Sequence, residues 1–203
     1  MIYLIITASI YNKSGIVNND HRKKRYIECI SAAIQLVQDT EIKLIVVENN
    51  GPKDTYLNNL GCDIVYTNNN KTLFSKGTKE LVDIQEVLRQ YNIKDDDTVI
   101  KLTGRYRLLS DAFFKLIRAR PDIDAFIKFF NVCTLQFDSH DCVLGLFAIK
   151  AKYLKSFVYP DKTSPEIEFA TYVRSKIKQE KILEISDLQL ECCFADDLRL
   201  VTV

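Results

Sequence analysis

Short apolar runs alternate with longer amphipathic segments along the first half of the chain. Each apolar run ends in polar or turn-forming residues, and the amphipathic segments repeat apolar residues at helical spacing. Strands are predicted over residues 2–8, 43–51, 62–70 and 97–108, and helices over residues 21–38, 55–61 and 76–92. This order is typical of an α/β fold with a mainly parallel sheet and helices on both faces.

The pattern changes after residue 109. Helices are predicted over residues 110–120, 150–158 and 164–180, and strands over residues 124–130, 133–137 and 142–150. Residues 181–193 alternate between apolar and polar, which predicts one strand. No repeat or linker divides the chain, so we expect a single domain over residues 1–203 whose second half, from residue 110, is smaller and mixed in structure.

Composition narrows the class of protein. Hydrophobic residues make up 47% of the 203 residues and charged residues 27%, which is enough apolar surface for a packed core. The net charge of +1 argues against a general nucleic-acid binder. No apolar run is long enough to span a bilayer, and the six cysteines form no C-x-x-C pair. We therefore expect a cytoplasmic protein with reduced thiols.

Polar and small residues follow each of the four predicted parallel strands. Ligands of open α/β sheets bind outside the carboxyl ends of the strands, so these residues are the first candidates for a site. They are Thr7, Ala8 and Ser9, then Glu48, Asn49 and Asn50, then Tyr66, Thr67 and Asn68, and finally Thr103, Gly104 and Arg105. Asparagine and glycine after a strand also form ordinary turns, and this alternative stands for the three asparagines.

Arg105 needs a partner, because an arginine left unpaired at the end of an interior strand costs free energy. Glu48 and Asp63 are possible carboxylate partners. A phosphate is the alternative, since the planar guanidinium binds it with two parallel hydrogen bonds. Other cations in the sequence near this edge are Lys101, Arg107 and the basic run 21–25, which contains Arg22. The phosphate motifs G-x-x-x-x-G-K-[ST] and G-x-G-x-x-G are absent, which disfavours a P-loop NTPase and a Rossmann dehydrogenase.

Six stretches resemble GT-A fold glycosyltransferases, particularly small transferase-like proteins of bacteria and large DNA viruses. They are YLIITASI (3–10), IVVENNG (45–51), SKGTKEL (75–81), IKLTGRY (100–106), VLGLFAIKAKYLKSF (143–157) and SPEIEFATYVRSK (164–176). The resemblance implies a Rossmann-like, GT-A-like sheet, with residues 1–109 binding a nucleotide sugar and residues 110–203 binding a glycan or other hydroxyl acceptor. It implies sugar transfer from a nucleoside-diphosphate sugar, in the host cytoplasm if the chain is viral.

The resemblance also suggests which residues bind the two substrates. Glu48 stands where the family usually has an acidic residue near the base. The donor-binding candidates are Thr7, Ala8, Ser9, Arg22, Glu48, Asn49, Thr67, Asn68, Lys76, Lys101, Thr103, Gly104 and Arg105. The acceptor-binding candidates are Asp138, His140, Asp141 and Gly145.

One departure from the family concerns the metal. Most members have Asp-x-Asp at the end of the fourth strand, where it holds a divalent cation on the donor diphosphate. This chain has Thr103, Gly104 and Arg105 there, and its acidic run 95–97 precedes the strand, at the opposite end. We therefore predict that Arg105 neutralises the diphosphate in place of a metal. Mn²⁺ or Mg²⁺ remains an alternative, with Asp138 and His140 as ligands, although such a stretch also suits an exposed hairpin loop.

Glu166 and Glu168 are the candidates for the catalytic base. Pro165 suits the first turn of a helix, where acidic residues are favoured whether or not they are catalytic. Inverting transfer needs a carboxylate that deprotonates the acceptor hydroxyl, and the resemblance favours Glu166 for this role. Retaining transfer stays open.

Two other functions remain as alternatives. A nucleotidyltransferase normally has a glycine- and lysine-rich first loop, and TASIYNKSG (7–15) matches it thinly. A non-catalytic nucleotide-sugar-binding domain is favoured by the missing Asp-x-Asp and disfavoured by Glu166 and the polar strand ends.

Overall fold

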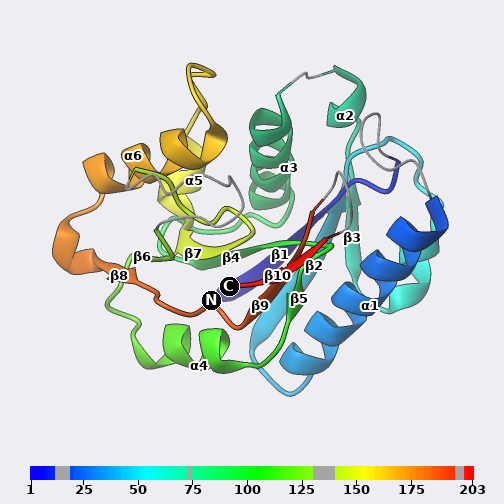
Figure 1. Ribbon diagram of the computed structural model, residues 1–203, viewed down its shortest axis with the longest axis horizontal. Coiled ribbons are helices and arrows are strands. Elements are labelled where there is room, and N and C mark those ends of the chain that lie inside the picture. The colour runs from blue at the N-terminus through cyan, green and yellow to red at the C-terminus, as the bar shows by residue number, and fades with distance from the viewer. Residues whose placement is uncertain (12–18, 73–74, 130–139, 195–198) are drawn as a thin grey trace.

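The computed structural model describes residues 1–11, 19–72, 75–129, 140–194 and 199–203 (Figure 1). Its strands are β1 (Ile2–Ala8), β2 (Ile42–Glu48), β3 (Asp63–Tyr66), β4 (Thr98–Thr103), β5 (Arg107–Leu108), β6 (Ala125–Ile127), β7 (Leu146–Lys150), β8 (Ile182–Glu184), β9 (Leu190–Cys193) and β10 (Leu200–Thr202). Its α-helices are α1 (Asn19–Val37), α2 (Asn69–Thr72), α3 (Lys76–Gln90), α4 (Ala112–Ala119), α5 (Ala151–Ser156) and α6 (Pro165–Lys176). Two 3₁₀ turns, η1 (Tyr56–Leu60) and η2 (Gln179–Lys181), complete the described elements.

A seven-stranded sheet of order β3-β2-β1-β4-β7-β6-β8 forms the centre of the molecule. Strands β1 to β4 are mutually parallel where they pair, which confirms the predicted parallel arrangement. Strand β7 runs antiparallel to both β4 and β6, so strands of residues 110–203 extend the sheet begun by residues 1–109. Side chains such as Ile5, Val46 and Ile100 are fully buried, as expected for strands covered on both faces.

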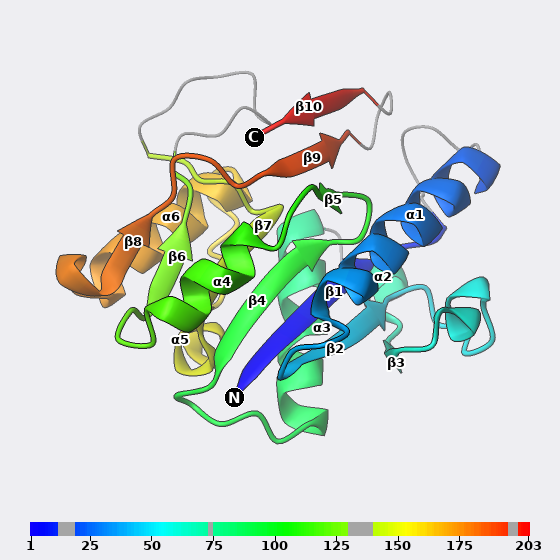
Figure 2. The same cartoon turned by 90° about the horizontal axis from the view of Figure 1, so that it is seen from below.

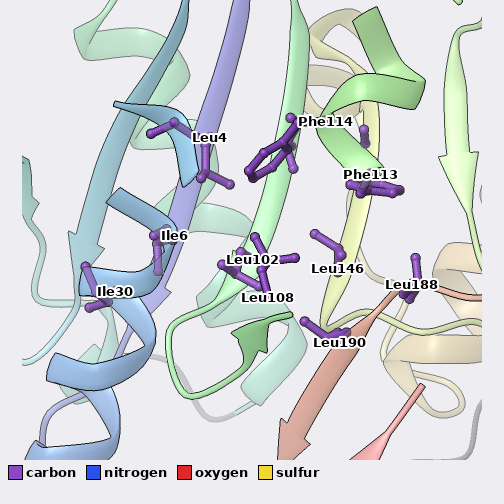
Figure 3. Packing of buried hydrophobic residues seen from close by; sticks show 14 of the residues in the cluster. Leu4, Ile6, Ile30, Leu102, Leu108, Phe113, Phe114, Leu146, Leu188 and Leu190 are labelled. Carbon is purple, nitrogen blue, oxygen red and sulfur yellow. The ribbon is translucent and has the colours of Figure 1, made fainter. Parts of the chain in front are cut away.

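Helices cover both faces of this sheet (Figures 1 and 2). Helices α1 and α4 cover one face, where Ile30 and Phe114 pack over Leu4, Leu102 and neighbouring side chains (Figure 3). Helices α3, α5 and α6 cover the other face, where a second apolar cluster includes Leu81, Leu154 and Phe169. Because the helices pack on the two faces of the sheet, the polar residues at the strand ends lie at its edges.

A small antiparallel sheet of order β10-β9-β5 lies beside the carboxyl end of β4 (Figure 2). The prediction of one strand over residues 181–193 is wrong, because this segment supplies β8 to the large sheet and β9 to the small one. A turn separates them: the Asp187 carboxylate accepts a hydrogen bond from the Gln189 N–H (2.9 Å), and Gln189 has a left-handed φ of 49°.

The single strand predicted over residues 97–108 is also wrong, because it divides into β4 in the large sheet and β5 in the small one. The strand predicted over residues 62–70 ends at Tyr66, and the unpredicted helix α2 follows it, whereas the other predicted elements of residues 1–109 are confirmed. In the second half, the helices α4, α5 and α6 and the strands β6 and β7 fall within predicted segments, whereas the strand predicted over residues 133–137 lies outside the described residues. Within the described ranges, none of the helices combines the length and apolar character needed to cross a membrane.

Candidate functional site

The carboxyl ends of β1, β2, β3 and β4 meet at one edge of the large sheet. Thr7 on β1 is in register with Thr103 on β4. The Gly104 N–H donates a hydrogen bond to the Thr7 carbonyl (2.9 Å), and the Thr103 N–H donates one to the Gly145 carbonyl (2.9 Å). Because Gly145 directly precedes the antiparallel strand β7, the second half of the chain also reaches this edge.

Glu48, at the end of β2, is fully buried and holds two strand ends together. Its carboxylate accepts hydrogen bonds from the N–H groups of Ile10 (3.2 Å) and Asn50 (3.0 Å) and from the Asn50 side-chain amide. These contacts link the segment after β1 to the segment after β2. Glu48 thus shapes the edge and is occupied by protein donors.

Asp83 on α3 is a site residue that the sequence analysis missed. Its buried carboxylate accepts hydrogen bonds from the side chains of Asn49 (2.9 Å), Thr67 (2.6 Å) and Asn69 (2.7 Å). Burial raises the pKa of Asp83, and the three hydrogen bonds act in the opposite direction. Because the amide nitrogen of Asn49 is turned to Asp83, Asp83 fixes the polar side chains at the ends of β2 and β3. A signal was present in the sequence, since Asp83 lies four residues before Val87, on the apolar face of the helix.

Asp83→Asn is expected to lower the free energy of unfolding by about 1–3 kcal/mol. The substituted amide turns N–H groups toward side chains that are themselves donors, which leaves buried donors unsatisfied. Urea unfolding followed by circular dichroism measures this loss. Unchanged stability would contradict the assignment of Asp83 as the common acceptor.

Arg105 has no carboxylate partner among the described residues. Its Nη1 donates to the Tyr26 hydroxyl (3.4 Å), whereas its Nε is buried without a hydrogen-bond partner in the described part of the chain. Glu48 is occupied as above, and Asp63 pairs with Lys43 (3.4 Å). Burial lowers the pKa of Arg105, but Tyr26, Tyr106 and Cys193 together raise it by more, so the pKa is raised and the guanidinium keeps its charge.

Arg22, in the first turn of α1, provides a second guanidinium beside Arg105. The side chain is only 4% exposed. Its Nε and Nη2 donate to the Ser9 carbonyl (3.0 and 2.7 Å), and Nη2 also contacts the Tyr26 hydroxyl (3.3 Å). Its Nη1 is buried with no partner in the described residues. Burial lowers the pKa of Arg22, and the charge of Arg105 acts in the same direction, as expected for two adjacent cations without a carboxylate partner in the part of the chain that the structure describes.

The backbone around Arg105 is fixed by α1 and by the small sheet. The Arg105 carbonyl accepts hydrogen bonds from Arg25 Nε (2.9 Å) and from the Cys29 thiol (3.2 Å). Arg25 also forms an ion pair with Glu191 on β9 (2.7 Å). Of the basic run 21–25, Arg25 therefore has a structural role, and Arg22 is the member with an unmatched N–H group.

Gly104 is required for this packing. A Cβ at this position would lie 2.8 Å from the Tyr26 ring and 3.0 Å from the Thr7 carbonyl oxygen. We expect Gly104→Ala to lower the free energy of unfolding by about 1–3 kcal/mol, because neither the packed ring nor the strand backbone can move freely. Thermal unfolding measures the effect, and a melting temperature equal to that of the wild type would show that the contact is not tight.

Lys101 is buried on the face of β4 that α3 covers. Its ammonium group donates to the Thr103 hydroxyl (2.7 Å) and the Leu144 carbonyl (2.6 Å), and it pairs with Glu80 on α3 (2.9 Å). The same Glu80 oxygen accepts a hydrogen bond from the Thr7 hydroxyl. The three ammonium hydrogens thus all have protein acceptors, and Lys101 fixes Glu80 against the ends of β1 and β4.

The start of α3 packs against the start of α6. A Cβ on Gly77 would lie 2.7 Å from the Pro165 Cβ, so the two helices touch here. Burial raises the pKa of Tyr159 well above its ordinary value, and the nearby carboxylates of Glu80 and Glu166 raise it further. The Tyr159 phenol therefore stays protonated, and the acidic side chains that raise its pKa come from both halves of the chain.

Glu166 and Glu168 have different surroundings. Glu168 is 8% exposed, and its carboxylate accepts hydrogen bonds from the backbone N–H groups of Asp161 (3.1 Å), Lys162 (2.5 Å) and Thr163 (2.9 Å). Glu168 therefore stabilises the loop before α6. Glu166 is partly exposed, and its carboxylate has no hydrogen bond or ion pair within the described residues.

The other predicted site residues are distributed around the same edge. Ala8 is buried beneath it, whereas Asn68 and Lys76 are exposed. Asp141 is buried and His140 is exposed. Gly145 is required because a Cβ there would lie 2.2 Å from the Tyr106 ring. Asp138 lies outside the described residues.

Among the described residues, the carboxylates at this edge form no site suited to a divalent metal. In the described ranges there is no group of three histidine, cysteine, aspartate or glutamate side chains suited to hold one. Glu48 and Asp83 accept hydrogen bonds from protein donors, Glu80 contacts Thr7 and Lys101 through Oε1, and Arg105 stands after the end of β4. The acidic run 95–97 lies at the amino end of β4, as predicted, where Asp95 pairs with Lys155 (2.7 Å).

No protein-family model and no curated protein matches the sequence, whereas solved structures match the fold. Glucosyl-3-phosphoglycerate synthase of Mycobacterium tuberculosis, in complex with Mg²⁺ and UDP, superposes with a TM-score of 0.59 at 15% identity, over 90% of this chain and 68% of that chain. The galactosyltransferase LgtC, in complex with donor and acceptor sugar analogs, gives 0.52 at 10% identity, over 90% and 72%. The chain has a GT-A-like fold. A197 from STIV shares the fold over nearly its full length, with a TM-score of 0.50 at 12% identity over 99% of this chain and 93% of that chain. Within the GT-A-like fold, β4 is the strand whose carboxyl end carries Arg105.

Proposed function

We propose that the chain is a glycosyltransferase that moves a sugar from a nucleoside-diphosphate sugar to a hydroxyl group of a glycan or other acceptor. The observation that carries the proposal is the pair of guanidinium groups, Arg22 and Arg105, with unmatched buried N–H groups at the carboxyl edge. Similar solved structures bind UDP or sugar analogs, which supports a nucleotide-sugar donor.

The arginine pair would stabilise the leaving group. A nucleoside diphosphate gains negative charge as the bond to the sugar breaks, and fixed cations that face this charge lower the barrier. Guanidinium groups bind phosphate oxygens through paired N–H donors and do not need a metal for this. Arg105 would contact the diphosphate directly, and Arg22, held by the Ser9 carbonyl, would add the second charge.

Glu166 would act as the catalytic base. Its carboxylate has no partner in the described residues and lies in the first turn of α6, near the carboxyl edge. Residues 110–203 would bind the acceptor, with His140, Asp141 and Gly145 beside the end of β4. Deprotonation of the acceptor hydroxyl by Glu166 gives an inverting reaction, in which the acceptor oxygen bonds to the anomeric carbon as the diphosphate leaves.

Incubation with single nucleotide sugars tests the function. We expect the protein to release the nucleoside diphosphate from at least one of UDP-glucose, UDP-galactose, UDP-N-acetylglucosamine and GDP-mannose, with EDTA present. A thermal shift with nucleoside triphosphates alone would favour a nucleotidyltransferase. No thermal shift with any nucleotide would contradict a nucleotide site, and binding without release would favour a non-catalytic binding domain.

A further inference from the structure

Glu80 is a carboxylate at the carboxyl edge that the proposed transfer reaction leaves without a role. It lies on α3, five residues after the N-cap residue Ser75. It faces the ends of β1 and β4, where it contacts Thr7 and Lys101. Its side chain is 30% exposed, whereas that of Lys101 is 2% exposed. The carboxylate thus stands between a buried cation and the open edge.

The two oxygens of this carboxylate differ in their surroundings. Oε1 accepts the hydrogen bond from Thr7 and lies 2.9 Å from the Lys101 ammonium. Oε2 has no hydrogen-bond partner in the part of the chain that the structure describes. One oxygen is therefore anchored and the other can accept a hydrogen bond from a ligand. Holding the carboxylate by a buried ion pair removes rotamer freedom before any ligand binds, which favours binding.

The position of Glu80 suits a ligand that also reaches Arg105. The Lys101 ammonium group that pairs with Glu80 also donates a hydrogen bond to the Thr103 hydroxyl. Thr103 is two residues before Arg105 in the sequence. The start of α3, which carries Glu80, packs against the start of α6, which carries the predicted base Glu166, since a Cβ on Gly77 would lie 2.7 Å from the Pro165 Cβ. A group attached to a diphosphate at Arg105 and attacked beside Glu166 would therefore pass near Glu80.

We infer that Glu80 binds a hydroxyl group of the donor sugar and so selects donors whose sugar carries that hydroxyl. The inference rests on the proposed function, because it assumes a nucleotide-sugar donor. A sugar hydroxyl donates its hydrogen to Oε2, and the charge of the carboxylate makes this hydrogen bond stronger than a neutral one. The nucleotide part of the donor makes no contact with Glu80, so the contribution appears only with the sugar attached.

The test compares each nucleotide sugar with its own nucleoside diphosphate. Isothermal titrations of UDP, UDP-glucose, GDP and GDP-mannose are measured for the wild type and for Glu80→Gln. In the wild type the nucleotide sugar of the accepted pair should bind more tightly than its nucleoside diphosphate. In Glu80→Gln the affinity for that nucleotide sugar should fall about 10- to 100-fold, whereas the affinity for the nucleoside diphosphate changes little.

A second variant separates sugar binding from damage to the ion pair. Glu80→Gln leaves the buried Lys101 unpaired, and Glu80→Gln/Lys101→Met removes that unpaired charge. The double variant should remain unable to distinguish the nucleotide sugar from its nucleoside diphosphate. The inference would be overturned if Glu80→Gln, or the double variant, still bound the nucleotide sugar more tightly than its nucleoside diphosphate, as the wild type does. Failure of the wild type to bind any of the four probes would instead contradict the proposed function itself.

Discussion

Arg105→Ala is expected to weaken nucleoside-diphosphate binding by about 30- to 150-fold. A hydrogen bond to a charged group contributes about 2–3 kcal/mol, and each 1.4 kcal/mol corresponds to about a tenfold change in affinity. Arg105 has no competing carboxylate among the described residues, so its charge is available to the ligand. Equilibrium titration with UDP and GDP measures the change.

Arg107→Ala is the matched control for this variant. Arg107 is exposed on β5 and lies two residues from Arg105, so its removal changes the net charge by the same amount. Its affinity for the nucleoside diphosphate should stay within about threefold of the wild type, since surface charges are screened by solvent. Equal losses in both variants would mean that Arg105 contributes only long-range attraction.

Glu166→Gln is expected to lower the turnover number by about 10²- to 10⁴-fold while leaving nucleoside-diphosphate affinity unchanged. This is the usual contribution of a positioned general base, and the amide cannot accept the acceptor proton. Steady-state kinetics with the accepted nucleotide sugar, together with binding titrations, separates the two effects. Weaker nucleotide binding with unchanged turnover would contradict the role of Glu166.

Glu168→Gln is the matched comparison on the same helix. Glu168 accepts hydrogen bonds from three backbone N–H groups in the loop before α6, and the amide leaves fewer acceptor sites for them. We expect a loss of about 1–3 kcal/mol in the free energy of unfolding with a smaller effect on turnover than Glu166→Gln. A larger loss of turnover in Glu168→Gln would reverse the order of the two residues.

The parallel half of the fold was predictable because its strands are short, apolar and separated by amphipathic helices. The order of strands in the second half was not. Strand β7 is as apolar as the parallel strands, so its antiparallel position beside β4 depends on contacts that the pattern does not contain. The turn at Asp187 was not predicted, because apolar and polar residues alternate on both sides of it.

The site was partly predictable. The ends of the predicted strands show which residues lie at the carboxyl edge, but they do not show which hydrogen-bond or ion-pair partners these residues have. Glu48 is the last residue of β2 and Arg105 lies two residues after β4. Only the structure shows that Glu48 accepts hydrogen bonds from backbone donors, while Arg105 has no carboxylate partner among the described residues. Lys101 was expected among the donor ligands because it is a cation close to Arg105. The structure shows that its ammonium group pairs with Glu80 on α3, a residue 21 positions earlier in the sequence, and that β4 ends at Thr103, before Arg105.

The proposed role of Arg22 and Arg105 can be compared with a metal-bound complex among the similar structures. Glucosyl-3-phosphoglycerate synthase was solved with both Mg²⁺ and UDP. In this chain the carboxylates of Glu48 and Asp83 at the edge accept hydrogen bonds from protein donors, and Arg22 and Arg105 each have a buried N–H group without a partner in the described residues. In the proposed function, the positive charge that faces the diphosphate is supplied by these two guanidinium groups, which do not depend on the concentration of a cation.

Binding of UDP and GDP in the presence of EDTA, followed by addition of Mn²⁺, tests the central claim most directly. We expect at least one of the two nucleotides to bind the wild-type protein in EDTA, with an affinity that Mn²⁺ changes by less than about threefold. Binding that is absent in EDTA and appears only with Mn²⁺ would contradict the claim that Arg105 and Arg22 replace the metal.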